Sequence, residues 1–301
     1  MNHIKTLIII CLPSIIWGIL FIMATPIFKE VSPIYFALVR FLPSTMVSLI
    51  VLYFIEGRVA FKVDRKFLFV MLIGAVAMIG FNVIVWIGIK LSSGVMGAIF
   101  QPIQPLFAII VSFLLFRQKF NILTFITIVI AFFGVFFAAS EGDFTFLTQG
   151  EPMGLLLIFV GSFMVVFTGI YAPRFKDYSV LRFTVVTNSS GVMALLIFAF
   201  IENSLGFAPL PSMENILNVK WELLYTGILA GTLPNLIWYK GAKIIGAVNM
   251  MLVSNLVPVV TISGSVLIGF GVSIFELIGT VIIFIAMSIH YYNIKKTSQT
   301  L

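Results

Sequence analysis

The chain has 301 residues, of which 61% are hydrophobic and only 10% are charged, and its mean hydropathy is +1.17. A soluble domain needs far more charge to cover its surface, so this composition excludes one and indicates a chain that crosses a membrane several times. The net charge of +7 does not indicate a nucleic-acid binder, because the Lys and Arg residues separate apolar runs instead of gathering on one face.

Ten apolar stretches follow one another along the chain, each close to the twenty residues that a helix needs to cross roughly 30 Å of hydrocarbon. They are continuous, whereas the strands of a membrane barrel alternate apolar and polar residues over about ten positions. We therefore predict an all-α membrane protein with ten transmembrane helices. The expected ranges are 6–28, 33–55, 67–89, 92–116, 121–140, 153–172, 183–201, 222–239, 247–270 and 274–293.

The positive charges predict how these helices are oriented. Of the 18 Lys and Arg residues, 14 fall in one set of loops and 3 in the other, while Arg40 lies inside the second predicted helix. Loops rich in Lys and Arg stay on the cytoplasmic side of a membrane. We therefore expect a multi-pass protein of the inner (plasma) membrane with both termini in the cytoplasm.

One short passage occurs twice, as PIFKEVS at 26–32 and as PRFKDYS at 173–179, which is 147 positions later. Because each half would contain an odd number of helices, a second copy would enter the membrane from the opposite side. The sequence thus predicts two inverted five-helix repeats, 1–140 and 141–301, a construction that recurs in secondary transporters. A shift of 153 gives further pairs: Gly74 with Gly227, Asn82 with Asn235, Trp86 with Tyr239, Gly88 with Gly241, Lys90 with Lys243 and Pro105 with Pro258.

Several passages together resemble a known group of membrane proteins. They are Trp17-Gly18 in the first predicted helix, LVRFLP at 38–43, GAIFQPIQPLFAIIVSFLLFRQ at 97–118 and MMLVSNLVPVVTISGSVLIGFG at 250–271. The chain resembles the drug/metabolite transporter superfamily, and more narrowly its ten-helix EamA-type members. The resemblance implies export of small metabolites such as amino acids through a central cavity between the two halves.

Arg40 is the most informative candidate for substrate binding, because it lies about seven residues into the second predicted helix. A charge at that depth needs compensation. It can pair with a substrate carboxylate through its planar fork, or its long side chain can reach the headgroups or bond loop carbonyls. The 147-residue shift aligns Arg40 with Thr187, so the shared scaffold does not require the charge, which favours the first interpretation.

Amides and aromatic rings supply the other candidate substrate-binding residues. Asn82 and Trp86 are four positions apart, which places them on one face of a regular helix. Buried amides also bond neighbouring helices to each other, and aromatic rings also fill a protein core, so both interpretations stay open. The candidates besides Arg40 are Trp17, Asn82, Trp86, Gln101, Gln104, Tyr171, Asn235, Trp238, Tyr239 and Asn255.

The charged residues also narrow the choice of function. All 11 acidic residues fall in loops or at helix ends, which disfavours a proton-coupled cation exporter built on an intramembrane acid. One intramembrane arginine is too few for phosphorylated substrates. The chain offers no nucleophile with a base, no metal-ligand cluster and no paired acids, so we expect neither an enzyme nor a bound cofactor or metal.

We therefore expect a secondary transporter that exports small metabolites such as amino acids by alternating access. The alternatives are a multidrug or organic-cation efflux carrier, an uptake carrier for a small metabolite, and a lipid-scrambling membrane protein. The expected partners are a small-molecule substrate and the lipid bilayer, with no nucleic acid, and the sequence is compatible with a monomer.

Overall fold

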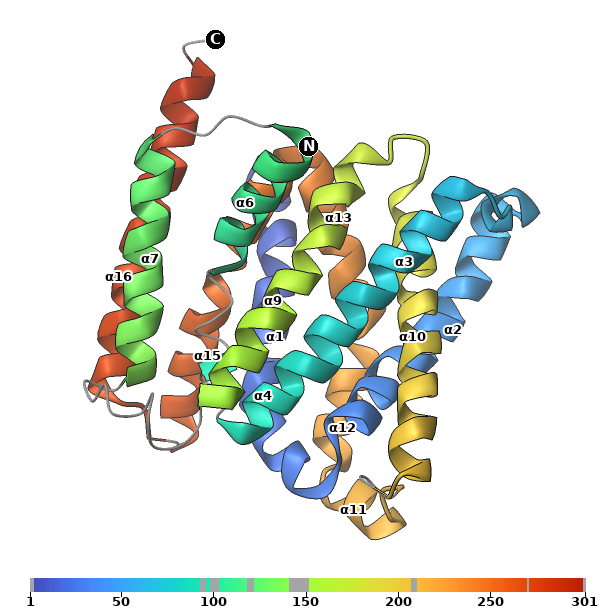
Figure 1. Ribbon diagram of the computed structural model, residues 1–301. Coiled ribbons are helices and arrows are strands. Elements are labelled where there is room, and N and C mark those ends of the chain that lie inside the picture. Colours follow the sequence, from blue (N-terminus) through green and yellow to red (C-terminus); the bar gives the residue numbers. More distant parts are fainter. Residues whose placement is uncertain are drawn as a thin grey trace.

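The computed structural model describes residues 3–92, 96–97, 103–117, 122–140, 152–206, 210–269 and 271–299. The regular structure of these residues is helical, and the long helices stand side by side in one bundle (Figure 1). The first half contains α1 (His3–Glu30), α2 (Pro33–Glu56), α3 (Arg65–Ile79), the π-helical turn η2 (Gly80–Val85), α4 (Trp86–Leu91), α6 (Gln104–Phe116) and α7 (Ile122–Ser140). The second half contains α9 (Pro152–Tyr171), α10 (Val180–Ser204), α11 (Met213–Asn218), α12 (Lys220–Ile228), α13 (Thr232–Ile245), α14 (Ala247–Val253), α15 (Leu256–Leu267) and α16 (Ile274–Gln299).

Five helical stretches are long and apolar enough to cross a membrane, judged by length and composition: Ile9–Glu30, Pro33–Glu56, Arg65–Leu91, Pro152–Arg174 and Val180–Ser204. They coincide with the first, second, third, sixth and seventh predicted helices. Shorter apolar helices occupy the fourth, fifth, ninth and tenth predicted stretches: Gln104–Phe116, Phe125–Gly134, Leu256–Leu267 and Ile274–Ala286. The eighth is divided into α12 and α13, and α13 continues to Ile245, so Lys240 and Lys243 are helical and not in a loop as predicted.

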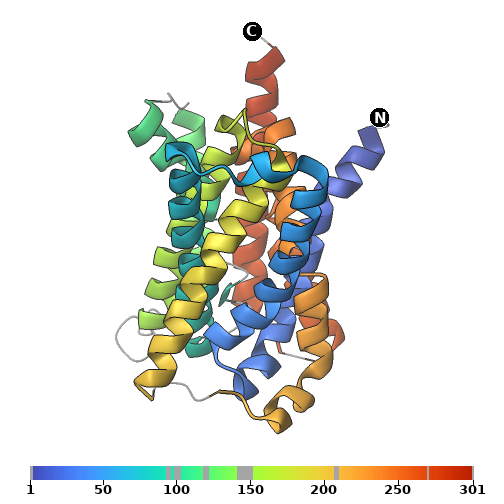
Figure 2. The same ribbon diagram turned by 90° about the vertical axis from the view of Figure 1, so that its right-hand side faces the viewer.

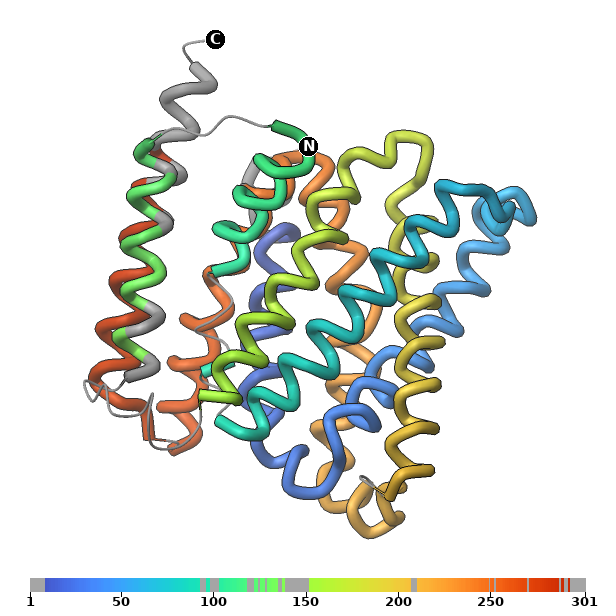
Figure 3. Tube along the Cα trace, viewed as in Figure 1, coloured from blue at the N-terminus to red at the C-terminus, as the bar shows by residue number. Residues whose placement is uncertain are grey.

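The two halves run in opposite directions through the bundle. Helix α1 begins and helix α16 ends at the same end of the molecule (Figure 1 and Figure 2). The tube in Figure 3 shows that α1 runs away from this end, whereas α9, which opens the second half, runs toward it. The structure therefore has the inverted arrangement that the repeated passage predicts.

The repeated passage marks the start of the second helix in each half. Its last residue, Ser32 or Ser179, is the N-cap of that helix. Consequently α2 begins at Pro33 and α10 at Val180, with the same offset of 147 residues. In the second copy the Ser179 side chain accepts a hydrogen bond from the Arg182 backbone N–H at 2.8 Å, as an N-cap serine usually does.

The acidic residue of each passage bonds to the opposite half. Oε2 of Glu30 accepts a hydrogen bond of 2.7 Å from the Asn215 amide, which lies in the short helix before α12. Oδ2 of Asp177 pairs with Nζ of Lys66, at the start of α3, at 2.5 Å. The hydrogen bond and the charge of Lys66 lower the pKa of Asp177. Each copy of the passage therefore links its own half to the other half, at the start of α3 in one case and in α11, just before α12, in the other.

Glycines let the halves approach closely where α9 crosses η2 and α4. A Cβ atom on Gly161 would overlap the carbonyl oxygen of Gly80, and one on Gly88 would lie 2.6 Å from the carbonyl oxygen of Gly154. Such small residues allow backbone contact between helices in membrane bundles, where van der Waals packing supplies much of the association energy. The contact holds the first helix of the second half against the third helix of the first half.

Candidate functional site

A cavity of about 90 Å³ lies between the two halves. That volume is several times the space needed to hold one water. Its walls come from α1, α2, α3, η2 and α6 of the first half and from α9, α10, α13 and α14 of the second half. Among the described residues that line it there is one arginine and no Asp or Glu, and most of the remaining polar groups are amides and hydroxyls.

Arg40 is buried, with 1% of its surface exposed, and it joins three elements at this cavity. From α2 its Nε donates to the carbonyl oxygen of Ala230 at 2.6 Å, and its Nη1 donates to Oδ1 of Asn82 in η2 at 3.2 Å. The guanidinium also lies 4.6 Å from the centre of the Phe41 ring. These contacts hold the charge inside the bundle instead of letting it reach the headgroup level.

The Ala230 carbonyl lies in the break between α12 and α13, and Pro234, four residues later, has no N–H to donate to it. In a regular helix the N–H of residue 234 would donate to this oxygen, but Pro234 has no N–H. Arg40 thus donates to a carbonyl oxygen that no helical N–H occupies. This contact matches the second interpretation made from the sequence, in which the side chain bonds loop carbonyls.

The rest of the guanidinium has no protein partner within the described chain. Its Nη2 takes part in no hydrogen bond there, and no described carboxylate forms an ion pair with Arg40. A buried charge without a counter-charge is costly, typically by several kcal/mol. The arrangement therefore presents a cationic donor that an anionic group in the cavity can neutralise.

The structure brings most of the predicted substrate-binding residues together. Seven of the eleven line the cavity: Trp17, Arg40, Asn82, Gln104, Asn235, Trp238 and Tyr239. Trp86, Tyr171 and Asn255 are not among its lining residues, and Gln101 lies outside the described residues. Binding of a substrate by any of the eleven stays a prediction.

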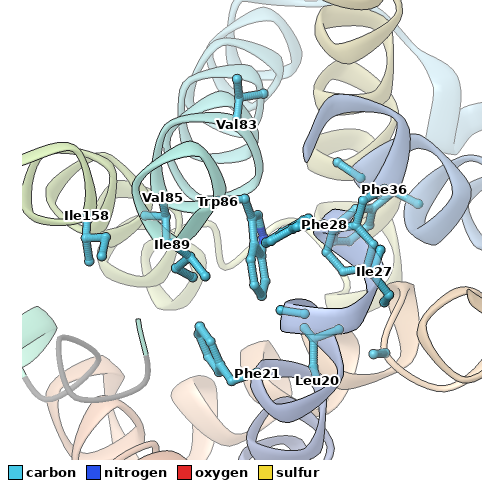
Figure 4. Close-up of a cluster of buried hydrophobic side chains, with 14 of the residues drawn as sticks. Leu20, Phe21, Ile27, Phe28, Phe36, Val83, Val85, Trp86, Ile89 and Ile158 are labelled. Carbon is cyan, nitrogen blue, oxygen red and sulfur yellow. The ribbon is translucent and has the colours of Figure 1, made fainter. Parts of the chain in front are cut away.

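Trp86 belongs to an aromatic core. It is 0% exposed, and its ring centre lies 5.1 Å from that of Phe21, 5.5 Å from that of Phe28 and 5.2 Å from that of Phe36. Figure 4 shows the indole among these three rings. Asn82, four residues earlier in the π-helical turn η2, lines the cavity, whereas Trp86 does not.

Tyr171 and Asn255 have other surroundings. The Tyr171 ring packs against Phe69 and Phe116, with centre distances of 5.0 and 5.6 Å. Asn255 is 4% exposed and lies between α14 and α15, which is the break in the ninth predicted helix that its position before Pro258 suggested. Neither polar atom of its side chain has a hydrogen-bond partner among the described residues.

Sequence reasoning missed the contribution of α10 to the cavity. Thr187 and Asn188 line it, and both are buried. A signal was present, because Thr184, Thr187, Asn188 and Gly191 recur at the spacing of one helix face and form a polar and small stripe in an otherwise apolar helix. All four are buried, as expected of a stripe that faces the other half.

The comparisons with known proteins agree with this architecture. The uncharacterized transporter YrdR of Bacillus subtilis (strain 168) is 29% identical over 279 residues, which cover 91% of this chain and 87% of YrdR. The uncharacterized transporter YyaM of the same organism is 29% identical over 309 residues and 99% of both chains. A protein of known crystal structure shares the fold, with a TM-score of 0.70 at 15% identity over 98% of this chain and 99% of that chain. The model of the EamA-like transporter family matches residues 4–140 and again residues 152–292, so the chain belongs to this family.

Proposed function

We propose that this transporter exports small metabolites such as amino acids, by alternating access around the cavity between its two halves. The supporting observation is a buried guanidinium that lines the cavity and has no described carboxylate to pair with. A carboxylate that enters the cavity would supply the missing negative charge and could accept hydrogen bonds from the planar fork. The substrate-binding role of Arg40 follows from this charge complementarity.

The size of the cavity agrees with a small solute. Its volume of about 90 Å³ is several times the space that one water needs and is too small for a large molecule. The rings of Trp17 and Trp238 supply apolar surface beside the amides, as ligand pockets commonly combine a few polar groups with apolar walls. A small amino acid has both kinds of group in one molecule.

The alternative of an organic-cation efflux carrier is less well supported. Such a carrier generally depends on an intramembrane acid, whereas the described lining has one cation and no carboxylate. An uptake carrier would use the same cavity in the opposite direction. We propose export because the chain resembles EamA-type exporters.

An efflux assay tests this proposal directly. Cells with and without the gene are loaded with dipeptides that release amino acids, and in parallel are challenged with amine drugs. We expect faster loss of one or more amino acids from the cells that express the protein, and no gain in drug tolerance. Drug tolerance without amino-acid efflux would support the organic-cation alternative, and increased accumulation of amino acids would indicate uptake.

The proposal includes ten spans with both termini in the cytoplasm. Helices α1 and α16 have their terminal ends on one side of the bundle, and the basic segment between α2 and α3 lies on that side too (Figure 1). Single cysteines placed at Lys62 and at Leu217 in a Cys11→Ser background should therefore differ in labelling. We expect an impermeant thiol reagent to label the second site, and not the first, in intact cells. Labelling of both positions from outside would contradict this topology.

A further inference from the structure

We propose that Asn235 is the specificity-determining residue for the amino group of the substrate, and that Asn188, Thr232 and Ser44 orient its amide so that Oδ1 accepts a hydrogen bond from a substrate N–H. This inference rests on the proposed function and adds a chemical requirement to it. The cavity would select solutes that carry a hydrogen-bond donor as well as a carboxylate.

The orientation of the amide follows from a chain of hydrogen bonds that starts at two unambiguous groups. The Ser44 hydroxyl lies 3.1 Å from the Arg40 carbonyl oxygen and 3.2 Å from that of Phe41. A carbonyl can only accept, so the Ser44 proton is used there. The backbone N–H of Thr232 can only donate, and it donates to Oγ of Ser44 at 3.3 Å. Ser44 therefore acts as an acceptor toward α13.

Each further step in the chain is then forced. The Thr232 hydroxyl lies 3.1 Å from Oγ of Ser44 and must be the donor in that contact. The Thr232 oxygen can therefore only accept a hydrogen bond from Asn188. Asn188 therefore presents Nδ2 to Thr232 at 3.1 Å and Oδ1 to Asn235. Asn235 must in turn donate through Nδ2, over 3.3 Å. Its own Oδ1 is left as an acceptor with no hydrogen-bond partner among the described residues, and Asn235 lines the cavity.

The repeat identifies what kind of group this oxygen lacks. The equivalent of Asn235 in the first half is Asn82, whose Oδ1 accepts from the Arg40 guanidinium. The equivalent of Arg40 in the second half is Thr187. The Thr187 hydroxyl donates to carbonyls of its own helix, at 2.9 Å to Phe183 and 3.0 Å to Thr184. The second half thus has the amide acceptor without the cation, and a substrate ammonium group would take the place of that cation.

Binding of three matched probes to the purified transporter tests the proposal: leucine, 4-methylpentanoate, which lacks the amine, and 3-methylbutylamine, which lacks the carboxylate. A hydrogen bond to a charged group contributes roughly tenfold or more in affinity. We therefore expect wild-type protein to bind leucine at least about tenfold more tightly than 4-methylpentanoate. Asn235→Leu should remove this difference without weakening 4-methylpentanoate.

The positioning residues are tested with Thr232→Val, which deletes the acceptor for Asn188. This variant should also reduce the preference for leucine, whereas Thr226→Val should not. Thr226 is the matched control because it is 0% exposed and, among the described residues, its hydroxyl bonds only to the Leu223 carbonyl of its own helix. Equal binding of leucine and 4-methylpentanoate by wild type, or an unchanged preference in Asn235→Leu, would overturn the inference.

The third probe separates this inference from the proposed function. If wild type binds neither carboxylate, the proposed function fails, and 3-methylbutylamine then decides the role of Asn235. Loss of amine binding in Asn235→Leu would still support the acceptor. No amine binding by wild type, or binding that Asn235→Leu leaves intact, would overturn it.

Discussion

Replacing Arg40 with Gln is expected to lower kcat/KM for carboxylate substrates by about 100-fold or more, because removing one partner of a buried charge pair costs roughly 3–5 kcal/mol. Gln at position 40 can still donate one hydrogen bond, but it has no charge to offset the substrate carboxylate. The loss should therefore grow with the negative charge of the probe, and transport of a neutral solute should change little. Flux of radiolabelled substrate in proteoliposomes measures the effect.

Arg40→Lys separates charge from geometry at the same site. Lysine keeps the positive charge but loses the planar fork, so we expect transport intermediate between wild type and Arg40→Gln. Because Arg40 also bonds Ala230 and Asn82, the thermal midpoint in detergent must be measured for both variants. The matched control is Arg58→Gln, at an exposed arginine after α2. Normal flux in Arg40→Gln would remove the proposed role of Arg40.

Much of the architecture could be predicted because it depends on local composition and on the repeat. The apolar runs predict the long helices, and the passages at 26–32 and 173–179 predict the offset with which α2 and α10 begin. Arg40 stood out because an isolated charge in an apolar run is costly wherever it lies. None of these predictions requires knowledge of which helices are neighbours.

The remaining features depend on contacts between distant parts of the chain. The hydrogen-bond chain from Ser44 through Thr232 to Asn188 joins residues that are 188 and 44 positions apart, and no local pattern reveals it. The break before α13 was missed because its signal, Pro234, lies inside the apolar run. Trp86 is not among the lining residues because its ring packs against rings of α1 and α2, and these neighbours cannot be identified from its own helix.

The burial of Trp86 among aromatic rings has a consequence for stability. Trp86→Ala is expected to lower the free energy of unfolding by about 3 kcal/mol, the size of effect produced by a large cavity in a well-packed core. Lipid is as apolar as the core, so the loss comes mainly from packing against Phe21, Phe28 and Phe36 and less from transfer to water. Reversible unfolding in mixed micelles measures this free energy. Trp221→Ala, at a tryptophan that is 72% exposed, is the control and should have little effect.

Trp86→Phe then distinguishes a core residue from a ligand-binding residue. The indole N–H is buried and has no partner among the described residues, so its removal relieves an unmet hydrogen bond while a ring remains in the cluster. We expect Trp86→Phe to lose much less stability than Trp86→Ala and to bind leucine as wild type does. Weakened leucine binding with unchanged unfolding would instead show that the indole reaches the substrate. In that case Trp86 would have to turn toward the cavity beside Asn82 in another state of the transport cycle.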